Sequence, residues 1–324
     1  MANQTFQNFS SPSEIPEFPN AGGCGMVDGL PYVRPTGSDP FPLLGGPTTS
    51  VRTVDPALAL ITAAVYATIQ AAVDASFTGD VIQIVPGTYN ETVTIPRVDS
   101  NNDPLSQLTL SGLFGGVFIV PTGNHASGLV CHADDVVLMN LSIASEDDAA
   151  GTFAAQITGA RFRASDCIFT GGEGQILLGP GTVAQVNAGT HGTAEDAQFE
   201  DCEFCNGLDG VGLRSSDYGA VIHPQFRDCW FHDLPAGSEI YDDGPMPYAD
   251  IVHGILLDTC LFDNAADGTP PTNYVTLAVT GNTGLITNCT FATPTNEADI
   301  IEIAAGIAYT ANKTEAGITT GRPS

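Results

Sequence analysis

Acidic side chains are the first candidates for chemistry in this sequence. Two carboxylates that meet on either side of a sugar can hydrolyse a glycosidic bond, and carboxylate oxygens are also the ligands that calcium prefers. The chain has 37 acidic residues against 9 basic ones, so most acidic clusters are expected to be solvated surface. We therefore predict no catalytic residue, no cofactor-binding residue and no metal ligand, with bound calcium or a hidden acid pair as the alternatives. The clusters in question are Asp134-Asp135, Glu146-Asp147-Asp148, Asp209, Asp217 and Asp242-Asp243.

The cysteines and histidines show no metal-binding pattern along the sequence. Cys202 and Cys205 form a Cys-x-x-Cys, but no second pair accompanies it. Residues three apart on a strand face opposite ways, so we do not expect these two thiols to share a zinc ion. The six histidines show no ligand spacing, and we expect each to be a hydrogen-bonded loop or edge residue. They are His125, His132, His191, His223, His232 and His253.

A repeat centred on cysteine must position these residues. Its segments are spaced by roughly 30 residues, which is typical of a solenoid with one coil per repeat. Cys and Phe are two apart in each segment, so both face one side of a strand and can stack on their equivalents in the next coil. We expect the five cysteines to behave as small buried hydrophobes. The segments are Asp166-Cys167-Ile168-Phe169, Asp201-Cys202-Glu203-Phe204, Asp228-Cys229-Trp230-Phe231, Thr259-Cys260-Leu261-Phe262, Asn288-Cys289-Thr290-Phe291 and the variant Asn140-Leu141-Ser142-Ile143.

The residue before each cysteine position predicts a corner. It is Asn or Asp in every copy except Thr259. Asn and Asp are the non-glycine residues that best tolerate the left-handed conformation, so we predict a sharp turn between two strands at this point. Three residues before each cysteine position lies another, mostly apolar, residue on the preceding strand. These residues are Leu138, Ala164, Phe199, Phe226, Leu257 and Ile286.

A helix is expected before the first repeat, over residues 55–77, with Asp55 as its N-cap and Pro56 at its first position. The segment Ile69-Gln70-Ala71-Ala72-Val73-Asp74-Ala75, followed by Gly79-Asp80-Val81-Ile82-Gln83-Ile84-Val85-Pro86-Gly87-Thr88-Tyr89, resembles the entry to right-handed parallel β-helices of the pectin-lyase-like superfamily. In that superfamily such a helix caps the open end of the solenoid. The resemblance implies an all-β fold: a single right-handed parallel β-helix over residues 55–303, with its capping helix at 55–77.

The same superfamily contains hydrolases and lyases whose motifs this sequence lacks. Polygalacturonase-type hydrolases have Asn-x-Asp, Asp-Asp, Gly-His-Gly and Arg-x-Lys motifs. Asp242-Asp243-Gly244 and Thr190-His191-Gly192 are only fragments of these, and Lys313, the single lysine, follows Ala311-Asn312. Lyases of this fold need a calcium-binding carboxylate cluster beside a base, and no Arg or Lys accompanies an acidic cluster in the repeat. The resemblance therefore implies the fold without implying the activity.

The two ends of the chain lie outside the repeat. Residues 1–54 are rich in Pro and Gly and lack periodicity, so we expect an extended anchoring arm that becomes ordered against other subunits. Residues 304–324 are expected to be a closing segment and tail. The sequence shows no signal peptide and no membrane span, which predicts synthesis in a cytoplasm without membrane insertion. A net charge of −28 repels nucleic acid and excludes it as a partner.

A β-helix with an irregular arm, strong acidity and no enzyme motif resembles surface proteins of tailed viruses. We therefore expect a non-enzymatic virion structural protein at the virion surface, a trimeric capsid decoration, cement or turret protein. Its arm (residues 1–54) would bind the major capsid protein or other virion proteins, and its body could contact host surface glycans. The alternatives are a tailspike or secreted polysaccharide-degrading enzyme of the same fold, and a carbohydrate-binding adhesin.

Overall fold

The structure is a computed structural model of the whole chain. It describes residues 8–9, 23–27, 30–34, 41–42, 50–56, 65–113, 115–123, 127–145, 152–172, 174–178, 194–207, 209–213, 221–233, 240–242, 252–263, 274–277, 281–292, 301–303, 305–314 and 319–320.

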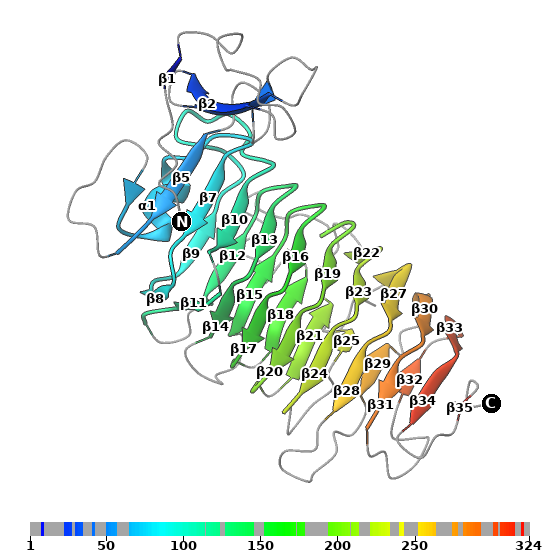
Figure 1. Cartoon of the computed structure of the whole chain (residues 1–324). Helices are drawn as coiled ribbons and strands as arrows, with labels where there is room; N and C mark the ends of the chain where they lie inside the picture. The colour runs from blue at the N-terminus through cyan, green and yellow to red at the C-terminus, as the bar shows by residue number, and fades with distance from the viewer. Residues whose placement is uncertain are drawn as a thin grey trace.

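Three long sheets form the body of the molecule, with every strand pair parallel except the one made by the last strand, β35 (Figure 1). Among the described residues they contain eleven, ten and eight strands, and we call them sheets I, II and III. Sheet I consists of β5 (Val51–Val54), β6 (Val65–Tyr66), β7 (Val81–Ile84), β10 (Thr109–Gly112), β13 (Val137–Met139), β16 (Arg163–Ser165), β19 (Gln198–Glu200), β23 (Gln225–Arg227), β27 (Ile255–Asp258), β30 (Thr283–Thr287) and β33 (Gly306–Thr310). Sheet II consists of β8 (Gly87–Asn90), β11 (Val117–Val120), β14 (Ser142–Ala144), β17 (Ile168–Thr170), β20 (Glu203–Cys205), β24 (Trp230–His232), β28 (Leu261–Asp263), β31 (Thr290–Phe291), β34 (Asn312–Thr314) and β35 (Thr319–Thr320). Sheet III consists of β9 (Val93–Ile95), β12 (Leu129–Cys131), β15 (Phe153–Ile157), β18 (Gly174–Leu178), β21 (Asp209–Leu213), β25 (Ile240–Asp242), β29 (Val275–Leu277) and β32 (Ile301–Ile303).

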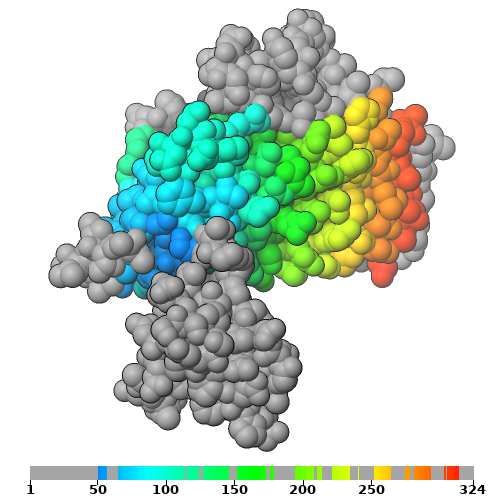
Figure 2. All heavy atoms as spheres, turned by 90° about the horizontal axis from the view of Figure 1, so that it is seen from above, coloured from blue at the N-terminus to red at the C-terminus, as the bar shows by residue number. Residues whose placement is uncertain are grey.

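Each coil contributes one strand to each sheet, in the order I, II, III. The strands β19, β20 and β21 form one coil, for example, and pair in parallel with β23, β24 and β25 of the next. Figure 2 shows the coils following one another in sequence order along the body. Two short strands, β22 (Val221–Ile222) and β26 (Val252–His253), pair with each other between sheets III and I. The right-handed parallel β-helix expected from the sequence is confirmed.

From β13 and β14 onward, the corner between sheets I and II is made by a single left-handed residue in each coil. The residue before every cysteine position has a φ angle between 52° and 59°, as the Asn/Asp pattern predicts. Thr259 adopts this conformation too, although it is β-branched, and Ala311 adds one more corner near the end of the chain. The corners are Asn140, Asp166, Asp201, Asp228, Thr259, Asn288 and Ala311.

Stacked aromatic rings fill the core on the inner faces of sheets I and II. In sheet II, Phe204 stacks on Phe231 with ring centroids 4.6 Å apart, and Phe231 stacks on Phe262 at 4.8 Å. In sheet I, Phe199 stacks on Phe226 at 4.9 Å. All five side chains are fully buried. The predicted phenylalanine ladder is confirmed, and its spacing is that of neighbouring strands in a sheet.

The cysteines form a second ladder at the start of the sheet II strands. The five cysteines of the repeat are buried free thiols, as predicted. Three of them donate a hydrogen bond to a carbonyl of the preceding coil at 3.5 Å, as Cys229 does to Phe199 O. A small side chain with a weak donor therefore fits the narrow corner without leaving that donor unpaired.

The helix at the start of the solenoid is much shorter than predicted. It is α1, residues Ile69–Asp74, and its N-cap is Thr68 rather than Asp55. The prediction of a helix from residue 55 is wrong because Val65 and Tyr66 form β6, which pairs with β5. Ile69, Ala72 and Val73 are buried in the core. Within the described parts of the chain, no helix is long and apolar enough to cross a membrane.

A buried ion pair holds the segments around α1 together. Asp80 is fully buried and accepts hydrogen bonds from the Arg52 guanidinium at 2.9 Å and from the backbone and hydroxyl of Ser50. Arg52 also donates to the Tyr66 hydroxyl at 2.7 Å. The Glu91 carboxylate accepts the first free N–H groups of α1 at 2.8 and 2.9 Å. These charges lie at the N-terminal end of the solenoid, beside its first strands.

The limits of the solenoid also differ from those expected. Val51–Val54 pairs with β7 in sheet I, so the first solenoid strand lies inside the segment expected to be the arm. Further towards the N-terminus, β1 (Asn8–Phe9), β2 (Gly23–Val27), β3 (Leu30–Arg34) and β4 (Phe41–Pro42) form a small sheet of their own. At the other end, β33 and β34 continue sheets I and II beyond residue 303.

Candidate functional site

The acid pair Asp134-Asp135 is bound by an arginine from the next coil. Arg161 contacts Asp135 through Nε and a second guanidinium nitrogen at 2.6 and 2.8 Å, and Asp134 at 3.8 Å. This hydrogen bonding holds the pKa of the Asp135 carboxyl below its usual value. Our expectation that no basic residue accompanies an acidic cluster is therefore wrong. Arg161 is distant from this acid pair along the chain, but the stacking of the coils brings it into contact with the pair. The pair is an exposed ion-pair cluster at a corner.

Two of the remaining acidic candidates, Asp209 and Asp242, belong to neighbouring strands of sheet III. Asp209 begins β21, whereas Asp242 ends β25 opposite Leu213. Four residues of strand separate the two backbone positions, or roughly 13 Å along the sheet. The other candidates, Glu146, Asp147, Asp148, Asp217 and Asp243, lie outside the described residues.

Three of the histidines have ordinary surroundings. His132 contacts the Thr158 hydroxyl at 2.8 Å, and burial lowers its pKa. His223 contacts Asp196 at 3.2 Å at the corner between sheets III and I, and His253 is exposed in β26. His125 and His191 lie outside the described residues. His232 differs from these, because it lies in the middle of sheet II rather than in a loop or at an edge.

The outer face of sheet II brings His232 together with residues that look unrelated along the chain. Strands β20 and β24 pair so that Glu203 lies opposite Trp230 and Cys205 opposite His232. The intervening phenylalanines point into the core, so these four side chains all point outward. Cys202 joins the core ladder while Cys205 points outward, so the expectation that the two thiols face opposite ways is confirmed.

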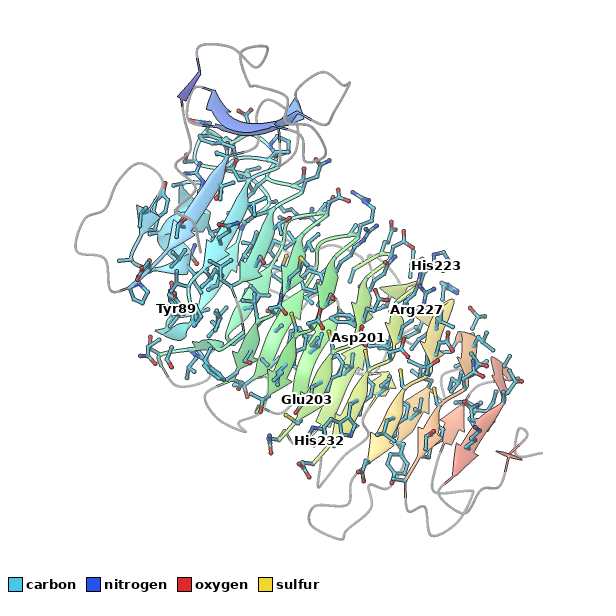
Figure 3. All side chains as sticks on the ribbon, viewed as in Figure 1. Tyr89, Asp201, Glu203, His223, Arg227 and His232 are labelled. Atoms are coloured by element: carbon cyan, nitrogen blue, oxygen red, sulfur yellow. The ribbon has the colours of Figure 1, made fainter. Side chains whose placement is uncertain are left out.

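Two carboxylates and an indole fix the His232 ring. Its Nε2 contacts Glu203 Oε1 at 2.9 Å, and its Nδ1 contacts Asp233 Oδ2 at 2.9 Å. The Trp230 ring stacks on the imidazole, with the centroids 3.8 Å apart and the planes 24° apart. Only 12% of the His232 side chain is exposed. Figure 3 shows Glu203 and His232 close together on sheet II, away from His223. Ring position and orientation are therefore set before any ligand arrives.

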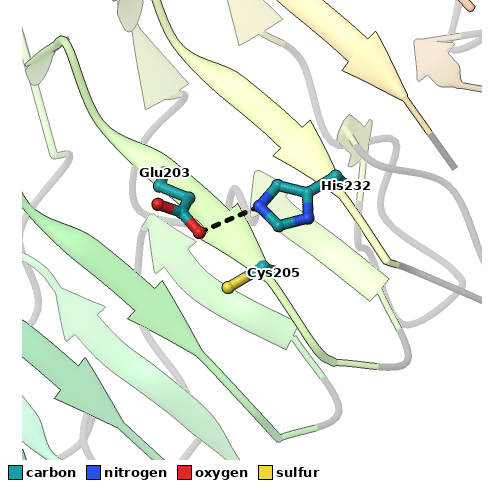
Figure 4. Close-up of side chains that lie close together, drawn as sticks. All are labelled: Glu203, Cys205 and His232. Atoms are coloured by element: carbon teal, nitrogen blue, oxygen red, sulfur yellow. Dashed lines mark hydrogen bonds and ion pairs between the residues drawn. The ribbon is translucent and has the colours of Figure 1, made fainter. Parts of the chain in front are cut away.

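The Cys205 thiol completes the cluster, which we call the β20–β24 cluster: Glu203, Cys205, His232 and Asp233. One donor atom from each of Glu203, Cys205 and His232 lies within 4.8 Å of the others (Figure 4). Burial, aided by the charge of Glu203, raises the pKa of Cys205 to about 11. A thiol with a raised pKa is protonated at neutral pH, and in that form it is a weak nucleophile.

Apolar side chains are also exposed on this face. Trp230 is 40% exposed, and Leu261, its neighbour in register, is 38% exposed. Phe118 is 48% exposed in β11, separated from β24 by β14, β17 and β20. Of these three side chains, Trp230 is the one that stacks on the His232 imidazole, a ring that hydrogen bonds hold in place.

The sequence contains a signal for this cluster that simple motif reading misses. When the repeats are aligned on their cysteines, Glu203 and Trp230 both fall one position after the ladder cysteine, and Cys205 and His232 three positions after it. Equivalent positions in adjacent coils are neighbours in space. These residues are far apart along the chain, but the alignment of the repeats places them at neighbouring positions on the sheet.

Comparison with known proteins finds similarity in structure alone. No protein-family model matches the sequence, and no curated protein matches it. Pectin methylesterase PemA from Erwinia chrysanthemi superimposes with a TM-score of 0.53 at 14% identity, covering 83% of this chain and 90% of that one. A pectin methylesterase from Aspergillus niger gives 0.53 at 15% identity, covering 86% and 93%. Pectate lyase Pel9A gives 0.55 at 13% identity, covering 86% and 73%. The chain therefore shares the right-handed parallel β-helix fold with these enzymes.

Proposed function

We propose that the protein is a non-enzymatic surface protein that binds carbohydrate on the outer face of sheet II. The observation that carries this proposal is the stack of the exposed Trp230 ring on His232, 3.8 Å between centroids. A fixed indole offers a flat apolar surface for the C–H face of a sugar ring. The Glu203 carboxylate beside it can accept hydrogen bonds from sugar hydroxyls, which is how polar groups give such sites their specificity.

The test of this proposal is binding of polysaccharide to variants of the full-length chain. We expect Trp230→Ala to weaken binding to a host capsular or cell-wall polysaccharide by about tenfold or more, as for a central aromatic contact. Phe118→Ala is the matched control, since it removes an equally exposed aromatic from the same sheet. Equal affinity of wild type and Trp230→Ala for every polysaccharide that binds would refute the proposal.

The location we propose is the surface of a virion, where the chain forms a trimeric decoration protein of a capsid. Its support is the combination of the N-terminal segment, the net charge of −28 and the missing enzyme motifs. The part of this segment before Ser50 would contact the major capsid protein. Particles assembled with a chain lacking residues 1–49 should then lack the protein, and normal incorporation of the shortened chain would contradict this assignment.

A second candidate is a polysaccharide-degrading enzyme. It is favoured by the similar structures, which are a pectate lyase and pectin methylesterases. Against it stands the acid pair Asp134-Asp135, which Arg161 binds. Release of reducing ends or of unsaturated products from a bound polysaccharide, lost in Asp242→Asn, would favour the enzyme over the binding protein.

A further inference from the structure

We infer that Glu203, Cys205 and His232 bind a divalent metal ion that accepts sulfur ligands, Zn²⁺ above all. They offer one carboxylate oxygen, one sulfur and one imidazole nitrogen, which are the three donor types of protein zinc sites. The three donor atoms lie within 4.8 Å of one another, although no motif links them along the chain. Three protein ligands leave a fourth position of a tetrahedral ion open to water or to a ligand.

The distance between the oxygen and nitrogen donors suits a zinc ion after a small adjustment. Bonds of about 2.0–2.1 Å to nitrogen and oxygen place two such ligands on a tetrahedral ion about 3.3 Å apart. Glu203 Oε1 and His232 Nε2 are 2.9 Å apart, so the carboxylate must withdraw by a few tenths of an ångström. The Glu203 side chain is 32% exposed and can move, whereas the His232 side chain is 12% exposed and held on both sides.

Asp233 provides the support that metal-binding histidines use. Its carboxylate contacts Nδ1 of His232 at 2.9 Å, while Nε2 faces Glu203 and Cys205. With a metal ion on Nε2, the ring proton is on Nδ1 and is donated to Asp233. A carboxylate on the far nitrogen orients the ring and strengthens it as a ligand. The Trp230 ring fixes the imidazole plane from one face. A plain hydrogen-bonded surface histidine needs neither of these supports.

The charge around the cluster favours a cation. Glu203 and Asp233 both contact the imidazole, and Asp263 lies beside His232 in the next strand. The outward positions of β17, β20, β24 and β28 contain no Lys or Arg. Coordination displaces the proton of the Cys205 thiol, because the thiolate is the metal ligand. The ion then compensates the thiolate and the carboxylate together.

The experiment uses the full-length, tag-free chain, stripped with a chelator and then dialysed against Zn²⁺ or Co²⁺. We expect one zinc ion per chain by elemental analysis, and a thiolate-to-cobalt charge-transfer band in the Co²⁺ form. Cys205→Ser should abolish the band, and His232→Ala should abolish stoichiometric binding. Asp233→Asn should weaken zinc affinity by about 10- to 100-fold while leaving the ligands in place. Circular dichroism of each metal-free variant checks that the fold is retained.

Matched controls separate this site from other thiols and acids. Cys24→Ser, His223→Ala and Glu200→Gln each remove the same kind of group elsewhere, and all should retain one zinc per chain with the band intact. A wild-type chain that retains no zinc, or a Cys205→Ser chain that retains the cobalt band, would overturn the inference. Trp230→Ala should keep the metal, so loss of carbohydrate binding and loss of metal binding can be told apart.

Discussion

The inner and outer faces of sheet II are built from the same strands but follow different rules. On the inner face, β20, β24 and β28 repeat one residue, with Phe204, Phe231 and Phe262 stacked 4.6 and 4.8 Å apart. On the outer face, the residues that lie opposite one another change from coil to coil, as the neighbours of Cys205 and His232 do. Stacking in the core selects one shape for every coil, whereas solvent places no such requirement on the outside. The outer face is therefore where we expect specific binding.

Removing one ring from the inner stack should have the largest effect on stability. Phe231 stacks between Phe204 and Phe262 and is fully buried, so Phe231→Ala leaves a cavity that the neighbouring coils cannot close. We expect a loss of about 3–5 kcal/mol in the free energy of unfolding, measured by urea denaturation. Trp230→Ala, one residue away on the outer face, should cost less than about 1.5 kcal/mol. Similar losses for both would mean that the two faces do not differ as described.

The corner between the faces offers a gain in stability. Thr259 is the β-branched member of the corner positions, with a φ angle of 59°. Asn occurs at the equivalent position in the next coil, at residue 288, with a φ angle of 55°. Thr259→Asn should stabilise the chain by about 1 kcal/mol, because Asn adopts this conformation at a lower energetic cost than a β-branched residue does. Asn288→Thr is the reverse control and should destabilise by a similar amount; no change in either variant would contradict the explanation.

The smallest effect concerns His132, which follows the inward-facing Cys131 and is only half-buried. Burial lowers its pKa in the folded chain, so the unfolded chain binds this proton more readily. Stability from this group is therefore complete above the unfolded pKa of about 6.5 and declines as the pH falls below it. His132→Gln should flatten the decline between about pH 6.5 and 5, measured by thermal unfolding. An unchanged slope would show that this histidine is too exposed to matter.

The sequence predicts the features that recur in every repeat. It does not reveal the contacts that arise only when strands of neighbouring coils pair. The Phe and Cys ladders and the left-handed corners are visible because every coil must satisfy the same packing. The helix predicted from residue 55 is wrong because the propensity of one segment cannot reveal that Val65–Tyr66 pairs with β5. Similarly, Arg161 meets Asp135, and His232 meets Glu203, through parallel pairing of coils. Contacts of this kind require the repeats to be aligned before motifs are sought.

The final strand has a consequence for how the molecule ends. A stack of parallel coils presents, at its last strand, an open edge on which another chain could continue the ladder. In sheet II, β35 runs antiparallel to β34, pairing Thr319 with Lys313. A strand that pairs with the free edge of β35 would continue a mixed sheet rather than the all-parallel order of the coils. The reversal therefore interrupts the parallel order of sheet II, and we expect a chain shortened before residue 315 to associate end to end more readily.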